Sequence, residues 1–600
     1  MMIHQHNMRK SLLGLVLAAL TLSSCSDLLD KEPLNKIDSR EFFANVDELN
    51  LYANGLYIDF VPSAEDLTCS GSGTCDYLAT STTSSLLQSD FDVDKMSGWT
   101  YGAWTNLFRC NYFLENIPKA AGSTDATTLN RYRGIARFWR AWFYFDKVKT
   151  YGNVPWYSHT IDAADSVLLY KIRDDRELVM DSVLADLNFA VANLKADPSE
   201  LVSANTALAL KSRVCLFEGT YRKYHKVNPS TNEPWKEANS SRRWLGECVK
   251  ASEALMDAGV YSLVNTGHPD TDYRSLFQSE KPLSQEVIMA REYSGELVAT
   301  HNVTQKFNSA GNDTRRWSPT QEFVNTYLNR DGSRFTDQPD YDKKTFVENC
   351  TNRDCRLEQS VITPAYKKNV NGTVQRYNAT WAVTMTGYQV IKFNMDDTYY
   401  EQTNRCTNSI PIFRYAEILL NEAEAKAELG EMDTKVWDKT IRPLRERAGV
   451  NGDAPTTADP YLVKYYLGKC TDKWLLEIRR ERAIELFFEG DGLRYDDLMR
   501  WGEGEMLTGD WSSIYIGQKN VAYDTNGDGV KDLEVCDGKP ATTVTGVYYI
   551  NLAKSSYYTF KDGRLYVKNE NDWSDKKYLH PIPRAALVKN PNLKQNYGWQ

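Results

Sequence analysis

A short acidic segment near the C-terminus has the oxygen spacing of a calcium-binding loop. Its oxygen-bearing side chains belong to Asp524, Asn526, Asp528 and Asp532. With Gly529 at the sixth position, they match the opening of such a loop. The twelfth position is Val535, and Glu534 stands one residue early, so the usual bidentate glutamate is missing. Two interpretations stay open, a structural calcium site or an Asx-rich turn between strands. We expect no other cofactor.

No segment carries a catalytic motif. The sequence lacks His-Glu-x-x-His, Gly-x-Ser-x-Gly and a P-loop. Beyond the N-terminal signal described below, the histidines stand in no catalytic pattern; they are His159, His225, His268, His301 and His580. A glycosidase needs two carboxylates held across a bond. With 80 acidic residues, pairs will occur by chance, and none is marked out. We therefore expect no enzymatic activity.

Cys25 is the residue whose chemistry the sequence defines best. Arg9 and Lys10 precede a short apolar run, Ser11–Leu22, which is typical of a secretory signal and too short to span a bilayer. The ending Leu-Ser-Ser-Cys resembles a bacterial lipobox, in which cleavage leaves the cysteine as a lipid-bearing N-terminus. We predict a signal peptide at 1–24, lipidation of Cys25 and a linker at 25–40. The alternative is an ordinary signal peptide that happens to hold a cysteine.

Two pairs of the remaining cysteines are close in sequence. They are Cys69/Cys75 and Cys350/Cys355. Because an exported chain can oxidise, each pair could close a short-loop disulfide or stay reduced. Neither pair has zinc-ligand spacing.

Composition narrows the class of partner. The net charge of the 600-residue chain is −9 and no long basic run occurs, which argues against nucleic acid. The 36 Tyr and 15 Trp residues are either core packing or a surface that stacks on flat apolar faces such as sugar rings.

Helical periodicity occurs in two blocks, 41–269 and 407–501, separated and followed by loop-rich inserts at 270–406 and 502–578. The strongest helix is Leu129–Tyr151, with an apolar stripe and Gly152 at its end. Asp174 with Glu177, and separately Asn205, are predicted to cap two more helices. Others are predicted at Val46–Asp59, Trp104–Ile117, Arg242–Ala258, Gln321–Leu328, Pro411–Leu429, Thr434–Ala448, Asp472–Glu489 and Leu493–Trp501. Paired helices of this length indicate a mainly α fold with an α-solenoid scaffold.

A series of motifs runs in a fixed order along the mature chain. They are Asn54-Gly-Leu-Tyr57, Asn111–Ile117, Ala136–Phe145, Tyr151-Gly-Asn-Val-Pro155, Arg414–Ala423, Glu481–Gly490, Arg494–Leu498, Pro581-Ile-Pro583 and Asn590-Pro-Asn592. In this order, behind a lipobox, they resemble the SusD/RagB family of Bacteroidota surface lipoproteins over essentially the whole mature chain. Acidic residues after Cys25 resemble the surface-export signal of these lipoproteins.

The resemblance implies an architecture and a role. We expect a single body at 41–600, with four tetratricopeptide-like helix pairs as scaffold and an irregular, loop-rich, ligand-facing part. We also expect a nutrient-binding protein, usually for glycans, that lids a SusC-like TonB-dependent transporter. The lipid anchor would hold it on the outer membrane, exposed at the cell surface.

The resemblance also implies that ligand residues come from loops after the first helix and from the mid-chain insert. The first loop offers Asp90, Asp92, Trp99 and Tyr101. The insert offers Arg291, Tyr293, Trp317, Trp381, Tyr399 and Tyr400. Each of these aromatic residues could instead pack in the core.

Three functions stay open at this point. The first is glycan capture and delivery to the transporter. The second is peptide binding by a relative within the same family. The third is a solenoid adaptor with no small-molecule ligand, which predicts no concave ligand site.

Overall fold

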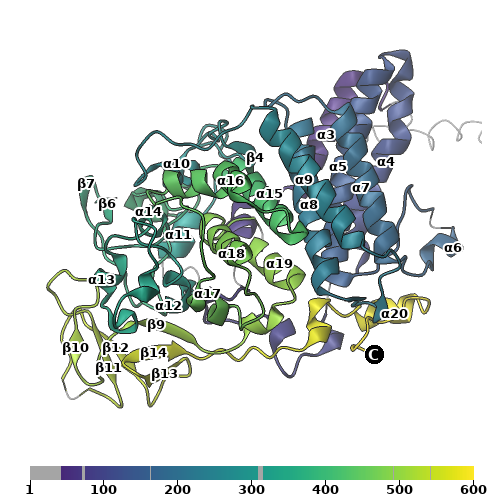
Figure 1. Ribbon diagram of the computed structural model, residues 1–600. Helices are drawn as coiled ribbons and strands as arrows, with labels where there is room; N and C mark the ends of the chain where they lie inside the picture. Colours follow the sequence, from purple (N-terminus) through teal and green to yellow (C-terminus); the bar gives the residue numbers. More distant parts are fainter. Residues whose placement is uncertain are drawn as a thin grey trace, which may run out of the picture.

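The computed structural model describes residues 42–70, 74–96, 98–162, 164–308, 315–490, 492–540 and 542–600. The predicted signal peptide, the lipidation of Cys25 and the linker lie outside these residues. Helices dominate the described chain, and its sheets are short, with two or three strands. In Figure 1 long helices stand side by side at one end, and the strands of segment 502–578 lie at the other.

The N-terminal block is an array of helices in which each packs on its neighbours. Its members are α3 (Val46–Phe60), α4 (Thr105–Asn116), α5 (Ala126–Tyr151), α7 (Arg176–Asn193), α8 (Ala204–Tyr224) and α9 (Ser240–Asp257). α5 contacts α3, α4 and α7, and α8 contacts α7 and α9. The array can form because each helix buries an apolar stripe, as α5 does with Ile135, Trp139 and Phe143.

The second helical block joins the first although a long insert separates them in sequence. It comprises α15 (Tyr415–Leu429), α16 (Thr434–Arg447), α17 (Pro460–Tyr465), α18 (Lys473–Glu485) and α19 (Leu493–Arg500). α15 packs on α9, α16 and α18, while α19 packs on α8. The predicted mainly α fold with an α-solenoid scaffold is confirmed.

Several predicted helix starts are displaced. Asp175 caps α7 by accepting from the Glu177 N–H, whereas Asp174 accepts from the Trp156 N–H. Ser203 caps α8 in a capping box with Thr206, so the predicted cap at Asn205 is wrong. Pro411 does not open a helix, because residues Ile410–Arg414 form strand β8 instead.

Short helices and small sheets occupy the inserts and the connections between the scaffold helices. The remaining helices are α6 (Ser166–Leu169), α10 (Asp272–Gln278), α11 (Val303–Asn308), α12 (Gln321–Val324), α13 (Phe346–Cys350), α14 (Cys355–Ser360) and α20 (Arg584–Lys589). The two-stranded pairs are β1 (Leu78–Ala79) with β5 (Ser318–Pro319), β2 (Val227–Asn228) with β3 (Glu233–Pro234), β4 (Val287–Arg291) with β8, and β6 (Lys367–Val370) with β7 (Thr373–Arg376). The predicted helix from Gln321 therefore ends earlier, at Val324.

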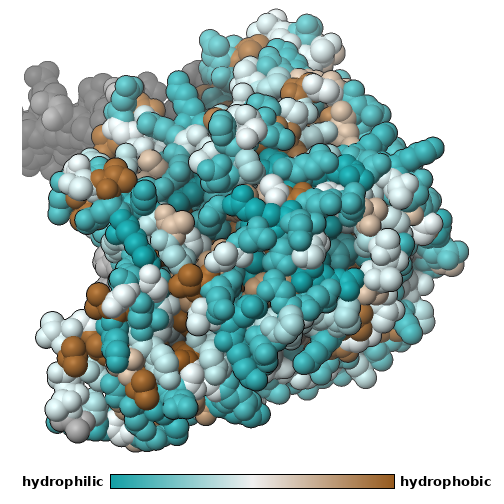
Figure 2. Space-filling view, turned by 60° about the vertical axis from the view of Figure 1, so that its left-hand side comes forward, coloured by the Kyte–Doolittle hydropathy of each residue, from teal (hydrophilic) through white to brown (hydrophobic). Residues whose placement is uncertain are grey.

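The segment 502–578 is more regular than its composition indicates. It forms two three-stranded sheets. One contains β13 (Tyr558–Lys561), β14 (Arg564–Val567) and β9 (Trp511–Tyr515), all antiparallel. The other contains β10 (Ala522–Tyr523), β11 (Leu533–Cys536) and β12 (Tyr548–Asn551). Figure 2 shows that the face turned toward the viewer near this end is largely hydrophilic, with small hydrophobic spots interspersed.

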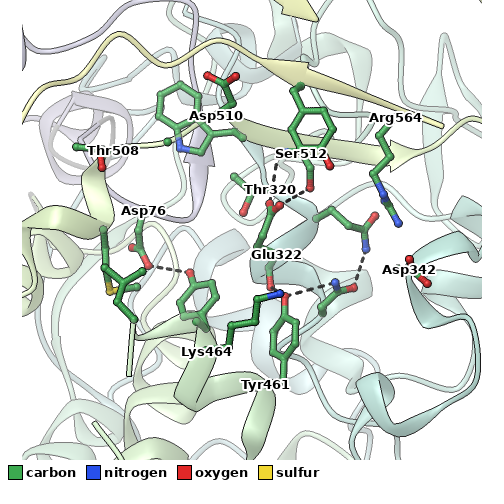
Figure 3. A pocket seen from close by; sticks show the side chains of 18 of the residues that line it. Asp76, Thr320, Glu322, Asp342, Tyr461, Lys464, Thr508, Asp510, Ser512 and Arg564 are labelled. Atoms are coloured by element: carbon green, nitrogen blue, oxygen red, sulfur yellow. Dashed lines mark hydrogen bonds between the residues drawn. The ribbon is translucent and has the colours of Figure 1, made fainter. Parts of the chain in front are cut away.

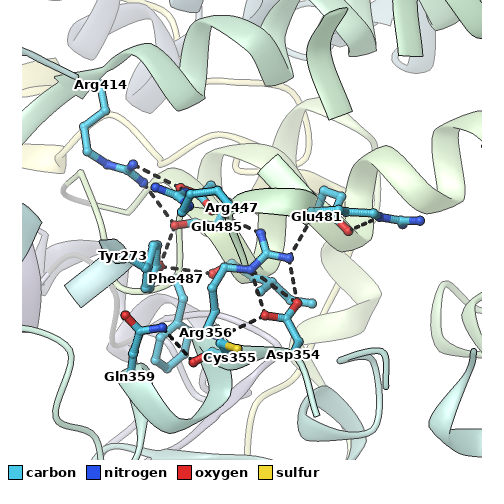
Figure 4. Close-up of polar contacts among 12 residues, drawn as sticks. Tyr273, Asp354, Cys355, Arg356, Gln359, Arg414, Arg447, Glu481, Glu485 and Phe487 are labelled. Atoms are coloured by element: carbon cyan, nitrogen blue, oxygen red, sulfur yellow. Dashed lines mark hydrogen bonds and ion pairs between the residues drawn. The ribbon is translucent and has the colours of Figure 1, made fainter. Parts of the chain in front are cut away.

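A buried ion cluster joins the scaffold to the insert (Figure 4). Glu485 of α18 is fully buried. Its carboxylate oxygens form ion pairs with guanidinium nitrogens of Arg447 of α16 at 2.5 Å, Arg414 of β8 at 3.0 Å and Arg356 of α14 at 3.1 Å. Burial alone would raise the pKa of Glu485, but the three guanidinium groups hold it well below the usual range. Removing one partner of such a cluster would leave a buried charge unpaired, which is costly. The cluster therefore ties the insert to the scaffold helices.

Candidate functional site

A polar cleft of about 550 Å³ opens where α17, α12, β9 and β14 meet (Figure 3). We call it the polar cleft; its main lining residues are Asp76, Thr320, Glu322, Tyr341, Asp342, Tyr461, Lys464, Tyr465, Glu505, Thr508, Asp510, Trp511, Ser512, Asp562, Arg564 and Tyr566. Its volume lies within the range of about 300–1,000 Å³ typical of small-molecule sites.

Helix α17 supplies the aromatic wall. Asp459 caps the helix by accepting from the Tyr461 N–H at 2.7 Å, and Pro460 occupies its first position. Tyr461 and Tyr465 are one turn apart, so they lie on the same face. Their ring centroids are 6.4 Å apart, and Tyr341 lies 6.1 Å from Tyr461.

The hydroxyl groups of this wall are held by the neighbouring segments. Tyr461 donates to the Glu322 carbonyl at 2.8 Å, and Tyr465 donates to the Asp76 carboxylate at 2.7 Å. Burial raises the pKa of both tyrosines, so both stay protonated donors. The rings are therefore rigidly placed.

The opposite wall comes from the β9–β14 sheet. Ser512 donates its hydroxyl to Glu322 at 2.6 Å, and Arg564 donates to the Ser513 carbonyl at 3.0 Å. Asp510 accepts from the Asn569 N–H at 3.0 Å. Figure 3 shows Asp510, Ser512 and Arg564 across the cleft from Lys464 and Tyr461.

Two charged side chains of the cleft stay available to a ligand. Asp342 and Lys464 are both exposed, and neither forms a hydrogen bond or ion pair with another of the described residues. Of the other acids, Asp76 is neutralised by Arg494 at 2.6 Å. No histidine or cysteine is among the lining residues. Tyrosine rings beside free donors and acceptors suit a hydroxylated ring as ligand.

A second cleft, of about 420 Å³, lies between α4, α6, α20 and the 3₁₀ helix η5 (Tyr101–Trp104). We call it the aromatic cleft, because its lining includes Trp99, Tyr101, Trp104, Phe108 and Tyr157. The Trp99 and Trp104 rings meet edge to face at 5.3 Å. Its lining is mostly apolar, unlike that of the polar cleft.

The predicted ligand residues of the first loop separate into two groups. Trp99 and Tyr101 come together in the aromatic cleft, where Tyr101 is 90% exposed. Asp90 and Asp92 are exposed but line neither cleft, and Asp92 caps a short 3₁₀ helix by accepting from the Asp94 N–H.

Two predicted ligand residues of the insert belong to the core. Trp317 and Trp381 are each only 4% exposed. Trp317 packs edge to face on Phe307, and the Trp381 indole donates to the Thr525 hydroxyl at 3.1 Å. This burial disfavours ligand contact, because aromatic residues favour burial as readily as a binding platform, and contact at these two positions stays a prediction.

The other four predicted residues line neither cleft. Arg291 donates to the Val61 carbonyl at 3.1 Å, and the Tyr293 hydroxyl accepts from the Ala64 N–H at 2.7 Å. Both polar groups are therefore used in hydrogen bonds to the backbone of the protein. Tyr399 is half exposed and forms a surface pair with Tyr400 at 5.2 Å. Ligand contact at this pair stays a prediction.

The proposed calcium loop is occupied by hydrogen bonds of its own chain. Asp524 accepts from the N–H groups of Gly527 and Gly529, each at 2.7 Å. Asp528 accepts from Asn378 at 2.7 Å, and Asp532 accepts from the Thr525 hydroxyl at 2.6 Å and from Asn526. Across the described chain, no group of three or more His, Cys, Asp or Glu side chains could hold a metal ion. The geometry favours an Asx-rich turn.

The Cys350/Cys355 disulfide is absent, since both thiols are free. Cys350 ends α13 and Cys355 begins α14, so each is fixed by its own helix. Burial raises the pKa of Cys350 to about 12, which leaves it an unreactive thiol. The side chain of Cys69 lies outside the described residues, so a Cys69/Cys75 disulfide stays a prediction.

The polar cleft was missed by the sequence analysis. Its free groups, Asp342 and Lys464, come from segments more than a hundred positions apart. One local signal could have been used: the Asp459-Pro460 helix start followed by Tyr461 and Tyr465 at helical spacing.

Among the described helices, none is long and apolar enough to cross a membrane.

Comparisons with known proteins cover nearly the whole chain. Residues 285–599, more than half of the 600, match the SusD family, and residues 61–231 match a family described as starch-binding associating with outer membrane. SusD-like protein P38 of Formosa agariphila is 24% identical over 83% of this chain and 92% of its own length. SusD-like protein P2 of the same species is 23% identical, over 84% and 92%.

Solved structures share the fold. A SusD-like carbohydrate binding protein from Bacteroides fragilis superposes with a TM-score of 0.65 at 20% identity, over 92% of this chain and 100% of that one. A further SusD-like protein from that species gives a TM-score of 0.64 at 20% identity, over 95% and 100%. The family match, the helical scaffold and the order of motifs agree: the chain belongs to the SusD family.

Proposed function

We propose that this chain is an outer-membrane lipoprotein that captures a glycan in the polar cleft and delivers it to a SusC-like TonB-dependent transporter. Two similarities support this role: one relative of known structure is a SusD-like carbohydrate binding protein, and one matching family is described as starch-binding associating with outer membrane. Lipidation at Cys25 would hold the binding site beside the transporter at high local concentration. The role requires binding and release without turnover.

The observation that carries the proposal is the composition of the polar cleft. Sugar rings present apolar faces and hydroxyl edges, so a site needs aromatic surfaces beside hydrogen-bonding groups. Tyr341, Tyr461 and Tyr465 supply the surfaces, and Asp342 and Lys464 supply free charged groups. The adaptor alternative expects no such concavity, so the cleft argues against it.

The test is a binding screen with matched variants. The mature chain is run in native gels containing neutral and acidic polysaccharides, and each polysaccharide that retards it is titrated by calorimetry. Asp342→Ala should weaken binding about tenfold or more, since hydrogen bonds to charged groups are worth about 1.5–3 kcal/mol. Asp337→Ala is the control, because Asp337 is exposed nearby and is not among the lining residues of either cleft.

Each outcome distinguishes the alternatives. Loss of affinity in Asp342→Ala with none in Asp337→Ala supports the proposed site. Failure to bind any polysaccharide, together with peptides found by mass spectrometry in the purified protein, would favour the peptide-binding alternative. Delivery is tested separately, by asking whether the anchored protein co-purifies with a TonB-dependent transporter from the same membrane.

A further inference from the structure

The aromatic cleft differs from the polar cleft in the kind of ligand it can hold. Its rings meet at steep angles: Trp104 lies edge to face with Trp99 at 5.3 Å and with Tyr157 at 6.2 Å. Tyr101 and Phe108 add further aromatic surface, 90% and 46% exposed. Such a lining can enclose a flat apolar ring on more than one side.

Several polar groups of this cleft are already used by the protein. The Asn111 amide donates to the Tyr157 and His159 carbonyls, both at 3.0 Å. Thr160 donates its hydroxyl to Glu115 at 2.7 Å, and Lys171 pairs with Asp174 at 2.5 Å. These groups are therefore less available to sugar hydroxyls.

The charge of the cleft is the second distinguishing feature. None of its described lining residues is an aspartate or glutamate, although the chain as a whole has a net charge of −9. Lys589, the last residue of α20, is exposed at the cleft and forms no hydrogen bond or ion pair with the residues that the structure describes. An ammonium group beside an apolar cleft favours a ligand that joins a flat apolar body to a single negative charge.

We propose that the aromatic cleft is a second binding site, for an aromatic carboxylate of one or two rings. Its volume of about 420 Å³ is sufficient for such a molecule. The rings of Trp99, Tyr101 and Trp104 would contact the aromatic body, and Lys589 would contact the carboxylate. The site is independent of the polar cleft, which has different walls.

The test uses 2-naphthoate as probe, titrated into the mature chain by calorimetry and by quenching of tryptophan fluorescence. We expect one molecule per chain. Tyr101→Ala should weaken binding about three- to tenfold, which corresponds to the loss of one aromatic contact. Lys589→Gln should weaken 2-naphthoate about two- to fivefold and leave the neutral 2-naphthamide unchanged, because only the carboxylate contacts the ammonium.

Matched controls separate this site from others. Tyr597→Ala and Lys594→Gln change exposed residues that line neither cleft, and both should bind 2-naphthoate as the natural chain does. Asp342→Ala should also leave it unchanged, so failure of the glycan proposal would not affect this result. The inference is overturned if 2-naphthoate fails to bind at millimolar concentration, if Tyr101→Ala binds it normally, or if Lys589→Gln weakens both probes equally.

Discussion

Arg494 holds both carboxylate oxygens of Asp76, with its Nε and Nη2 atoms at 2.7 and 2.6 Å from them. The two side chains are each only 3% exposed, although they are separated by 418 positions in sequence. Tyr465 donates to the same carboxylate. One residue near the N-terminus is thereby tied to α19 and to α17, and the wall of the polar cleft is fixed by the helical scaffold.

Replacing Arg494 by Met should destabilise the fold strongly. The change leaves the Asp76 carboxylate buried and unpaired, which costs about 3–5 kcal/mol in comparable pairs. The free energy of unfolding in urea measures the loss. Asp76→Leu combined with Arg494→Met should recover much of it, because no charge is then stranded.

The matched control for that variant is Arg584→Met. Arg584 pairs with Asp94 at 3.2 Å, but both side chains are more than half exposed. Exposed pairs contribute about 0–1 kcal/mol, so this variant should unfold nearly as the natural chain does. Equal losses in the two variants would mean that burial does not set the strength of the Asp76 pair.

Acid should weaken the fold through two buried histidines. Burial lowers the pKa of His225 and of His580 to about 4, against an ordinary value of 6.5. Between those values the unfolded chain binds protons that the folded chain does not, so stability falls as pH drops from 6.5 towards 4. Above pH 6.5 both rings are neutral in the folded and the unfolded chain, so neither histidine lowers the free energy of unfolding there.

The measurement is the urea midpoint from pH 7 to pH 4.5, compared with that of His580→Phe. This variant removes one titrating group without adding a buried polar atom, so its midpoint should depend less on pH. The His225 ring has a hydrogen-bond partner, the Met499 carbonyl at 2.7 Å, and is a poorer choice for substitution. An unchanged pH dependence would contradict the assignment to His580.

The helical scaffold was largely predictable because its signal is local. Apolar residues at a period of 3.6 defined α3, α4, α5 and α9 to within a few residues. Caps were less predictable, since two acids in succession, Asp174 and Asp175, fit the same pattern. The predicted helix start at Pro411 failed because pairing with β4, more than a hundred positions earlier, makes this segment a strand.

The ligand-facing part was not predictable in the same way. Composition marked Trp317 and Trp381 as candidates, yet whether an indole is buried depends on contacts with distant residues such as Thr525. Conversely, Asp342 and Lys464 have no distinguishing sequence pattern. They form a site only because α17 and the segment after Phe335 are brought together by the fold.

Calcium should leave thermal stability unchanged. Asp524 accepts from two backbone N–H groups and Asp532 from Thr525 and Asn526, so the loop is already held by its own hydrogen bonds without a cation. We expect the same melting temperature in calcium as in a chelator, measured by calorimetry. A higher melting temperature in calcium, lost in Asp524→Asn, would restore the calcium interpretation.

A methyl group at Gly504 should be poorly tolerated. A Cβ atom there would lie 1.9 Å from the Trp573 ring, so the indole would have to move. Overpacking of this kind costs about 1–3 kcal/mol. Gly246→Ala is the control, because the site within α9 has nothing within 4 Å and alanine favours a helix by about 1 kcal/mol. Equal urea midpoints for the two variants would refute the packing argument.

Replacing Cys25 by Ala should release the protein from the membrane without changing its affinity for ligand. A lipidated cysteine anchors through its acyl chains, each buried CH₂ contributing about 0.8 kcal/mol, whereas the described residues that line both clefts belong to the folded body. Fractionation of cells should move the variant from the membrane to the soluble fraction. Its affinity in the polysaccharide screen should match that of the purified mature chain, because the tether raises local concentration and adds no contact to the cleft. A variant that stays in the membrane fraction after a high-salt wash would show that something other than the Cys25 lipid holds this protein there.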